Sequence, residues 1–335
     1  MRPINKAFWI FGLWILLSSA ALAQKSPDPA KSISDILAGK SYKLGLVAVS
    51  EKKWPQALKI FTALAKKNYA PALFRLGELY HRGRGVKIDH KKAIRYYTKS
   101  AVRRYARAQN NLGIVYRRGD IVKQNYVKAA YWFRKAAPNN DAAMNNLALA
   151  HRYGQGVKKS NVEAVRLLQI GIKNKYAKSV FVMERLYEKG RGVKKDFQEA
   201  MKLYRWAAIL KYDRALYVMG EIYRKGRGEV DVSFVKAERW YQYAINKDYR
   251  SGFYGMGLLL LTGKDDFKRN PTEALRMLKM ASERGHRKAP LEIGKMHAAG
   301  NGIKKNIKMA KRWFRLAIKR GDPAAKILLK RLDES

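Results

Sequence analysis

Small and apolar residues recur along this chain at a nearly constant interval. A Leu-Gly pair, or a close equivalent, returns every 35 to 37 residues, with its second residue at positions 77, 113, 148, 184, 220, 257 and 294. We call these the anchor positions. Each copy has a small residue five positions earlier, and most copies have an aromatic residue or a histidine one turn later. These positions fall near one face of a helix, so the pattern predicts one helix in each repeat unit.

A second helix is predicted in each unit, after a Gly-x-Gly loop such as Gly190-Arg191-Gly192. The first glycine suits the left-handed backbone just past a helix end. A polar residue that can cap a helix then stands four positions before an alanine. The seven cap residues are Asp89, Asn125, Ser160, Asp196, Ser233, Asn270 and Asn306. Bulky pairs such as Trp132-Phe133 follow the alanine and give a one-sided apolar stripe of helical period.

These features together resemble the Sel-one-like repeat family, a relative of the tetratricopeptide repeat (TPR). The resemblance rests on the pattern Leu-Gly-x-x-Tyr-x-x-Gly-x-Gly-Val-x-x-Asp-x-x-x-Ala-x-x-Tyr/Trp-Tyr and covers roughly residues 72–332. It implies an all-α fold, a right-handed αα solenoid of about seven repeats. It also implies a non-enzymatic adaptor whose concave groove holds protein partners, as in bacterial members that are often periplasmic or secreted.

Three units depart from this pattern. Glu184 replaces the anchor glycine, Asp120 replaces the second loop glycine, and residues 263–267 form a longer, altered loop. We expect these changes to alter the local loop shape and to leave the solenoid intact. A cysteine-rich branch of the family has been linked to β-lactam and peptidoglycan binding, and the absence of cysteine here excludes that branch.

The two ends of the array differ from its middle. Residues 40–76 are expected to form a degenerate TPR-like opening unit, in which Trp54-Pro55 begins the second helix and the Gly-x-Gly loop is missing. Residues 77–332 are the repeat array, and its last part, residues 323–332, is expected to be a C-terminal cap helix. Terminal units of a solenoid are atypical because one of their faces meets water.

The first 23 residues have the pattern of a signal peptide. Arg2 and Lys6 precede an apolar run, and Ala21-Leu22-Ala23 supplies the small residues that a signal peptidase accepts. Cleavage after Ala23 predicts a periplasmic or secreted protein, with residues 24–39 as a polar lead-in. The alternative is an uncleaved membrane anchor, but the apolar run is short for a bilayer span, and no later stretch is long and apolar enough.

The composition argues against an enzyme. The 335 residues include no cysteine and five histidines, which excludes a disulfide scaffold, a thiolate zinc site and a cysteine nucleophile. The Gly-x-Gly loops lack the strand and the Gly-Lys-Ser/Thr ending of a phosphate-binding loop, so helix termination explains them better. His151 and His297 occupy a position that holds tyrosine in other units and are best explained as packing residues. We therefore predict no catalytic residue, no cofactor and no metal site.

The charge is strongly positive, with 71 Lys and Arg against 26 Asp and Glu, a net charge of +45. Many of the basic residues lie in the loops between paired helices, and equivalent loops of a solenoid stack along one edge. This predicts a basic loop edge that contacts an anionic partner. Its residues are Arg82, Arg84, Lys87, Arg117, Arg118, Lys123, Arg152, Lys158, Lys159, Arg191, Lys194, Lys195, Arg224, Lys225 and Arg227. Two asparagines, Asn111 and Asn146, are candidate groove residues whose amides could pair with a partner backbone or only with water.

Three interpretations of the partner follow from the repeat and the charge. The first is a scaffold that binds a protein, especially one with an acidic surface. The second is a binder of an anionic envelope polymer such as lipopolysaccharide, acidic exopolysaccharide or peptidoglycan. The third, nucleic-acid binding, is disfavoured by the signal peptide and by the lack of a nucleic-acid-binding motif. Part of the charge also favours solubility and helix C-termini, and a basic host proteome would explain it without a partner.

Overall fold

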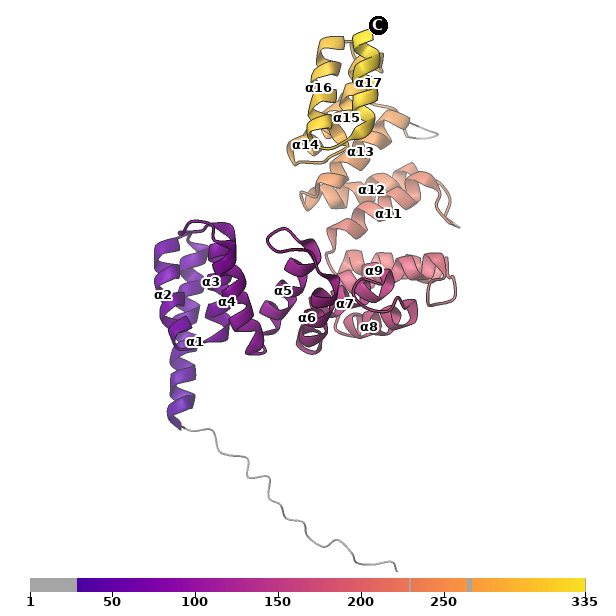
Figure 1. Ribbon diagram of the computed structural model, residues 1–335. Helices are drawn as coiled ribbons and strands as arrows, with labels where there is room; N and C mark the ends of the chain where they lie inside the picture. Colours follow the sequence, from indigo (N-terminus) through magenta and orange to yellow (C-terminus); the bar gives the residue numbers. More distant parts are fainter. Residues whose placement is uncertain (1–28, 229, 264–266, 335) are drawn as a thin grey trace, which may run out of the picture. The chain divides into compact units, whose positions relative to one another are not determined.

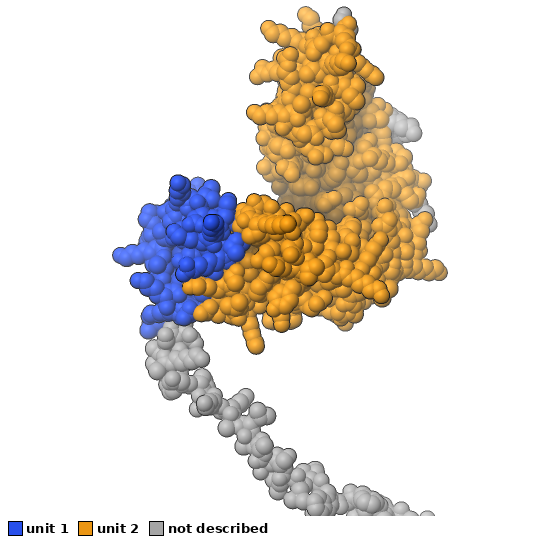
Figure 2. All heavy atoms as spheres, viewed as in Figure 1, with its two compact units in different colours: residues 1–96 blue, residues 97–335 orange. Residues whose placement is uncertain are grey.

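The computed structural model describes residues 29–228, 230–263 and 267–334, and its regular elements are helices (Figure 1). The helices are α1 Pro29–Ser50, α2 Trp54–Lys66, α3 Ala70–Arg82, α4 His90–Val102, α5 Ala106–Arg118, α6 Tyr126–Ala136, η1 Ala137–Asn139, α7 Asp141–Tyr153, α8 Asn161–Lys173, α9 Ala177–Lys189, α10 Phe197–Ile209, α11 Asp213–Lys225, α12 Phe234–Asn246, α13 Arg250–Thr262, α14 Pro271–Glu283, α15 Ala289–Ala299, α16 Ile307–Lys319 and α17 Pro323–Glu334. The backbone divides into two compact units, residues 1–96 and 97–335 (Figure 2). Within the second unit, each helix packs against the next one along the chain.

All seven predicted caps are confirmed by the structure. Each cap side chain accepts a hydrogen bond from the backbone N–H three residues later, over N···O distances from 2.8 Å at Asp89 to 3.4 Å at Ser233. A cap satisfies one of the four free N–H groups at a helix start and typically contributes about 1 kcal/mol. The second helix of each unit therefore begins where the sequence places it.

The glycine loops join the first and second helices of each unit and contact the preceding unit. The first glycine ends the preceding helix in the left-handed conformation, as Gly154 does with a φ of 68°. The second glycine lies against the start of an earlier helix: a Cβ at Gly156 would overlap the Tyr126 carbonyl at the start of α6. Its positive φ of 73° and this close approach both require glycine. In the sixth unit Gly263 has a ψ of 127° and leaves the left-handed region, as the altered loop sequence suggests.

The core of each unit forms where the anchor residue meets an aromatic or aliphatic side chain of the second helix. Gly113 lies against the Phe133 ring and Gly220 against the Tyr241 ring, and both rings are buried. The glycines let the two helices approach closely, and burial of one such ring contributes about 2–3 kcal/mol. At Glu184 a carboxylate occupies this position and faces Tyr204.

The ends of the array match part of the sequence prediction. α2 begins at Trp54 with proline in its first turn, and α17 closes the array from Pro323. The polar lead-in differs from a simple linker, because its residues 29–39 are the first part of α1.

The predicted signal peptide, residues 1–23, lies outside the described residues. Within the described part of the chain, no helix combines the length and the apolar character that a bilayer span needs.

Candidate functional site: a basic groove and a neutralised pocket

Helices α5, α7 and α9 and the start of α11 line a groove with a volume of about 550 Å³, which we call the Arg152 groove. In these units a small anchor residue such as Gly113 packs against the second helix, and other side chains of the first helix line the groove. Six cationic side chains line it, and none of its lining residues that the structure describes carries a carboxylate. The six are Arg117, Arg118, Arg152, Lys178, Arg185 and Arg214. The groove is therefore a concentrated positive site suited to an anionic ligand.

Arg152 is the most buried of these cations, with 6% of its surface exposed. Its guanidinium lies 5.2 Å from the centroid of the Tyr153 ring, and its Nε has no hydrogen-bond partner among the described residues. Burial lowers the pKa of Arg152, and the nearby charge of Arg185 acts in the same direction, whereas Tyr153 and Glu184 oppose the shift. A guanidinium in this setting stays charged, because its ordinary pKa lies far above neutral pH.

Arg117 and three asparagines, Asn110, Asn145 and Asn146, also line the groove. Arg117 donates a hydrogen bond to Oδ1 of Asn146 at 3.3 Å, and Asn146 donates to Oδ1 of Asn110 at 3.0 Å. Asn145 is buried, and its Oδ1 has no partner among the described residues. Asn146 and Asn110 line the groove, whereas Asn111 is not among the lining residues, and contact of any of them with a partner stays a prediction.

Glu184 is a buried carboxylate near the groove that does not neutralise it. Its surface is fully buried, and its two carboxylate oxygens have no hydrogen-bond partner of good geometry among the described residues. Burial raises the pKa of Glu184 to about 8, although the Tyr204 hydroxyl opposes the shift. Burial thus favours the protonated form of Glu184 at neutral pH, which weakens the charge that it can offer to Arg152.

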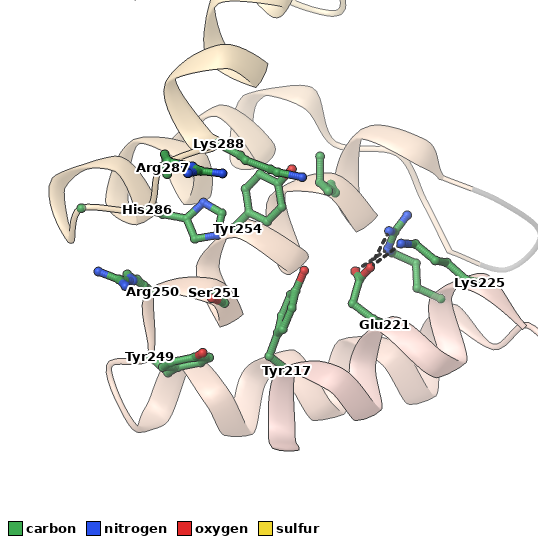
Figure 3. Close-up of a pocket in the computed structure, with 13 residues that line it drawn as sticks. Tyr217, Glu221, Lys225, Tyr249, Arg250, Ser251, Tyr254, His286, Arg287 and Lys288 are labelled. Atoms are coloured by element: carbon green, nitrogen blue, oxygen red, sulfur yellow. Dashed lines mark hydrogen bonds and ion pairs between the residues drawn. The ribbon is translucent and has the colours of Figure 1, made fainter. Parts of the chain in front are cut away.

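A second cavity of about 420 Å³ lies between α11, α13 and the turn after α14 (Figure 3). We call it the Glu221 pocket. Glu221 accepts hydrogen bonds from Arg224 at 2.9 Å and Tyr241 at 2.6 Å, and Lys225 lies 2.8 Å from its other oxygen. Burial raises the pKa of Glu221, but these donors outweigh it and bring the pKa down to about 2. On this side of the pocket the half-buried Arg224 therefore has a carboxylate partner within the chain.

The far side of the Glu221 pocket is cationic. Figure 3 shows Arg250 and His286 on the side opposite Glu221 and Lys225, with Tyr217 between them. The His286 ring stacks on Tyr254 with centroids 4.1 Å apart. Burial lowers the pKa of His286 to about 4, with Arg250 and Lys288 acting in the same direction. His286 is therefore neutral at pH 7.

The residues predicted for the basic loop edge fall into two groups. Most are exposed, namely Arg82, Arg84, Lys87, Arg118, Lys123, Lys158, Lys159, Arg191, Lys194, Lys195 and Lys225. Arg152 departs from the edge, since its side chain is buried at the groove. Arg117 and Arg224 are partly buried, and Arg227 binds Glu188 with its Nε at 2.9 Å and also donates to the Tyr204 hydroxyl. Whether the exposed residues contact a partner stays a prediction.

Sequence reasoning missed several groove residues on the first helices. Lys178, Arg185 and Arg214 line the groove, as do Tyr176 and Tyr212. A signal for the tyrosines was present, because a tyrosine immediately precedes the first helix in many units. These tyrosines are Tyr69, Tyr105, Tyr176, Tyr212 and Tyr249. No cluster of three or more histidine, aspartate or glutamate side chains suited to a metal occurs within the part of the chain that the structure describes.

Comparison with known proteins identifies the repeat. The family model for the Sel1 repeat matches seven segments, residues 70–101, 106–141, 141–176, 185–212, 213–249, 254–286 and 291–322. A Sel1 repeat protein from Oxalobacter formigenes is 25% identical, with a TM-score of 0.60, over 88% of this chain and 86% of that one. A protective antigen of uropathogenic Escherichia coli with an SLR fold is 23% identical, with a TM-score of 0.56, over 90% and 73%. No curated protein sequence matches the chain.

The matched repeats agree with the helix pairs, loops and caps seen in the structure. Sel1 repeats generally serve as scaffolds for protein interaction, and their fold is typically non-catalytic. Seven matched segments between residues 70 and 322 cover most of the sequence. The chain therefore belongs to the Sel1 repeat family, with an all-α fold of helical repeats.

Proposed function

We propose that this protein is a non-enzymatic scaffold of the periplasm or the extracellular space that holds an acidic protein partner in the Arg152 groove. The observation that carries the proposal is the groove itself, in which six cations face one concave space and no lining carboxylate is described. An acidic surface that enters this space replaces the missing counter-charges, so its binding gains from each desolvated pair.

The exposed basic loops support the same partner in a different way. Residues such as Lys158, Lys194 and Lys195 are exposed. Charges of this kind speed the encounter with an acidic protein and add little to the stability of the final complex. The exposed loops therefore attract the partner, and the groove binds it.

Cross-linking in the intact envelope tests the proposal. Lys178 lines the groove and is exposed, so an amine-reactive cross-linker attached there should join the chain to one discrete protein. That complex should survive a wash at about 0.5 M salt, where charges are screened over about 4 Å and only close contacts persist. Recovery of polysaccharide alone, lost in the salt wash, would support an anionic envelope polymer as the ligand and would contradict the protein scaffold.

The location has its own test. The mature chain recovered from the envelope or the medium should begin at Gln24 when its N-terminus is sequenced. A chain that keeps its first 23 residues and sediments with membranes would contradict the secreted location.

A further inference from the structure

We propose that Arg152 is the centre of a binding site for one compact oxyanion, and that the natural ligand is a carboxylate of the acidic partner. This inference rests on the proposed function for the source of the carboxylate and on the geometry of the groove for the site. Arg152 lines the groove, is nearly fully buried and has an unpaired Nε among the described residues.

The register of the repeat shows why this arginine lacks a partner. Arg117, Arg152 and Arg224 each stand four residues after an anchor position. In the Glu221 pocket the residue directly after the anchor is Glu221, which pairs with Arg224. The corresponding residue in the unit of Arg152 is Leu149, which lines the groove. The same register position that neutralises one arginine leaves the other without a counter-charge.

Several partly buried arginines of the described chain have carboxylate partners, whereas Arg117 and Arg320 donate to uncharged oxygens. In the first compact unit, Arg75 lies 2.6 Å from Glu78, which also stands directly after an anchor. In the second unit Arg227 pairs with Glu188. A buried charge without a partner is costly, and proteins normally offset it with an opposite charge or a hydrogen-bonding ligand. The unpaired Arg152 therefore indicates that the offset comes from outside the chain.

The surroundings of Arg152 define the chemistry of the ligand. The flat guanidinium offers two parallel N–H donors, which match the two oxygens of a carboxylate. Arg117 and Arg185 add positive charge to the same groove, and Asn146 adds an amide. Glu184 stays mostly protonated below pH 8, so it does not compete with an incoming carboxylate.

Small anions test the site without any partner protein. The purified chain is titrated at constant ionic strength with sodium glutarate and with sodium sulfate, while the Nε–Hε signals of its arginines are followed by NMR. We expect a saturable shift of the Arg152 signal. Arg152→Gln should weaken glutarate binding at least about tenfold, and Arg152→Lys should weaken it less, because lysine keeps the charge and loses the paired donors.

A matched control removes the same charge elsewhere. Arg134 is exposed on α6 and does not line the groove, so Arg134→Gln should change the affinity by less than about twofold. Arg117→Gln is the second groove variant, and it keeps the proposal testable if Arg152→Gln does not fold. Equal losses for Arg134→Gln and the groove variants, or an Arg152 signal that does not move, would overturn the site.

An acidic peptide separates this inference from the proposed function. Hexaglutamate should bind and displace glutarate, whereas hexaglutamine should not. Binding of sulfate and glutarate at Arg152, with no binding of hexaglutamate, would overturn the partner carboxylate and leave a small-anion site. Retention of the cross-linked protein partner by Arg152→Gln at full affinity would overturn the site and leave the scaffold intact.

Discussion

The Arg152 groove and the Glu221 pocket are built from the same repeat. They differ in whether the arginine four residues after the anchor has a carboxylate partner. In the Glu221 pocket the residue after the anchor is an acid, and it binds Arg224, Lys225 and Tyr241. In the Arg152 groove that position is Leu149, and Arg152 has no carboxylate partner among the described residues. A single register position therefore decides whether the arginine four residues after the anchor has a carboxylate partner within the chain.

The paired arginine contributes to local stability, whereas the unpaired arginine is suited to binding. The paired Glu221 and Arg224 side chains are only 13% and 15% exposed, so each protects the other from the cost of burial. Arg152 has no such partner among the described residues, so the folded protein without ligand is destabilised by the burial of this charge. A surface that gives up some stability in this way is suited to recognition, because the ligand recovers part of the lost free energy.

The largest effect is expected from removing the Glu221 carboxylate, which pairs with Arg224 in the Glu221 pocket. Glu221→Gln leaves Arg224 buried without a counter-charge and should lower the free energy of unfolding by about 3 kcal/mol. Chemical denaturation followed by circular dichroism measures the loss. The control is Glu163→Gln on α8, where the pair with Arg166 is largely exposed and the loss should stay below about 0.5 kcal/mol. Similar losses in both variants would remove the distinction between a buried and an exposed pair.

A second effect concerns the pH dependence that Glu184 imparts near the groove. Its pKa is raised to about 8, above the value of about 4.5 for an exposed glutamate. Between these two values the unfolded chain loses the proton and the folded chain keeps it, so stability falls as the pH rises toward 8 and then levels off. Below about pH 4.5 both states are protonated and the penalty is absent.

Glu184→Gln should remove this loss. The difference in unfolding free energy between the wild type and the variant should change by about 3 kcal/mol between about pH 5 and pH 8, and the wild type should be least stable relative to the variant at about pH 8. Taking the difference cancels His286 and the other titrating groups that the two proteins share. Parallel pH profiles would show that Glu184 is already ionised in the folded protein, and Arg152 would then have an internal counter-charge.

The third prediction converts the groove into a copy of the pocket. Leu149→Glu places an acid at the register position of Glu221, three residues before Arg152, and should pair with its guanidinium. Affinity for glutarate should fall by about tenfold, because the ligand must now displace an internal carboxylate. Val162→Glu adds the same charge on the exposed face of α8 and should leave the affinity within about twofold of the wild type. A loss that is equal in both variants would attribute the effect to net charge alone.

The sequence was sufficient to predict the repeat, the start of each second helix and the glycine that ends most first helices. Caps such as Asn125 and Ser160 act through neighbouring backbone groups, so their effect can be read from local spacing. The left-handed glycines are local in the same sense. The helical character of residues 29–39 was missed, because a polar segment gives little periodic signal.

The candidate site was less accessible from the sequence. Loop membership placed Arg152 and Arg227 on a basic edge, but their environments depend on side chains from other units. Arg227 meets Glu188, which is 39 residues away, and Asn146 meets Asn110, which is 36 residues away. Burial and pairing at this distance depend on how units stack, and the spacing within one unit does not contain that information.

The smallest effect concerns Lys225, which is compared with Arg224 as a partner of Glu221. Lys225 and Arg224 both bind Glu221, but the Lys225 side chain is 57% exposed, against 15% for Arg224. Water and salt screen the exposed contact, so Lys225→Gln should change the free energy of unfolding by no more than about 0.5 kcal/mol. Arg224→Gln should cost several times more, because it leaves the buried Glu221 with fewer donors. Thermal and urea denaturation of the two variants at low and high salt measure the difference. If Lys225→Gln is as damaging as Arg224→Gln, burial does not decide the strength of these pairs, and the burial of Arg152 is then no reason to expect an external counter-charge.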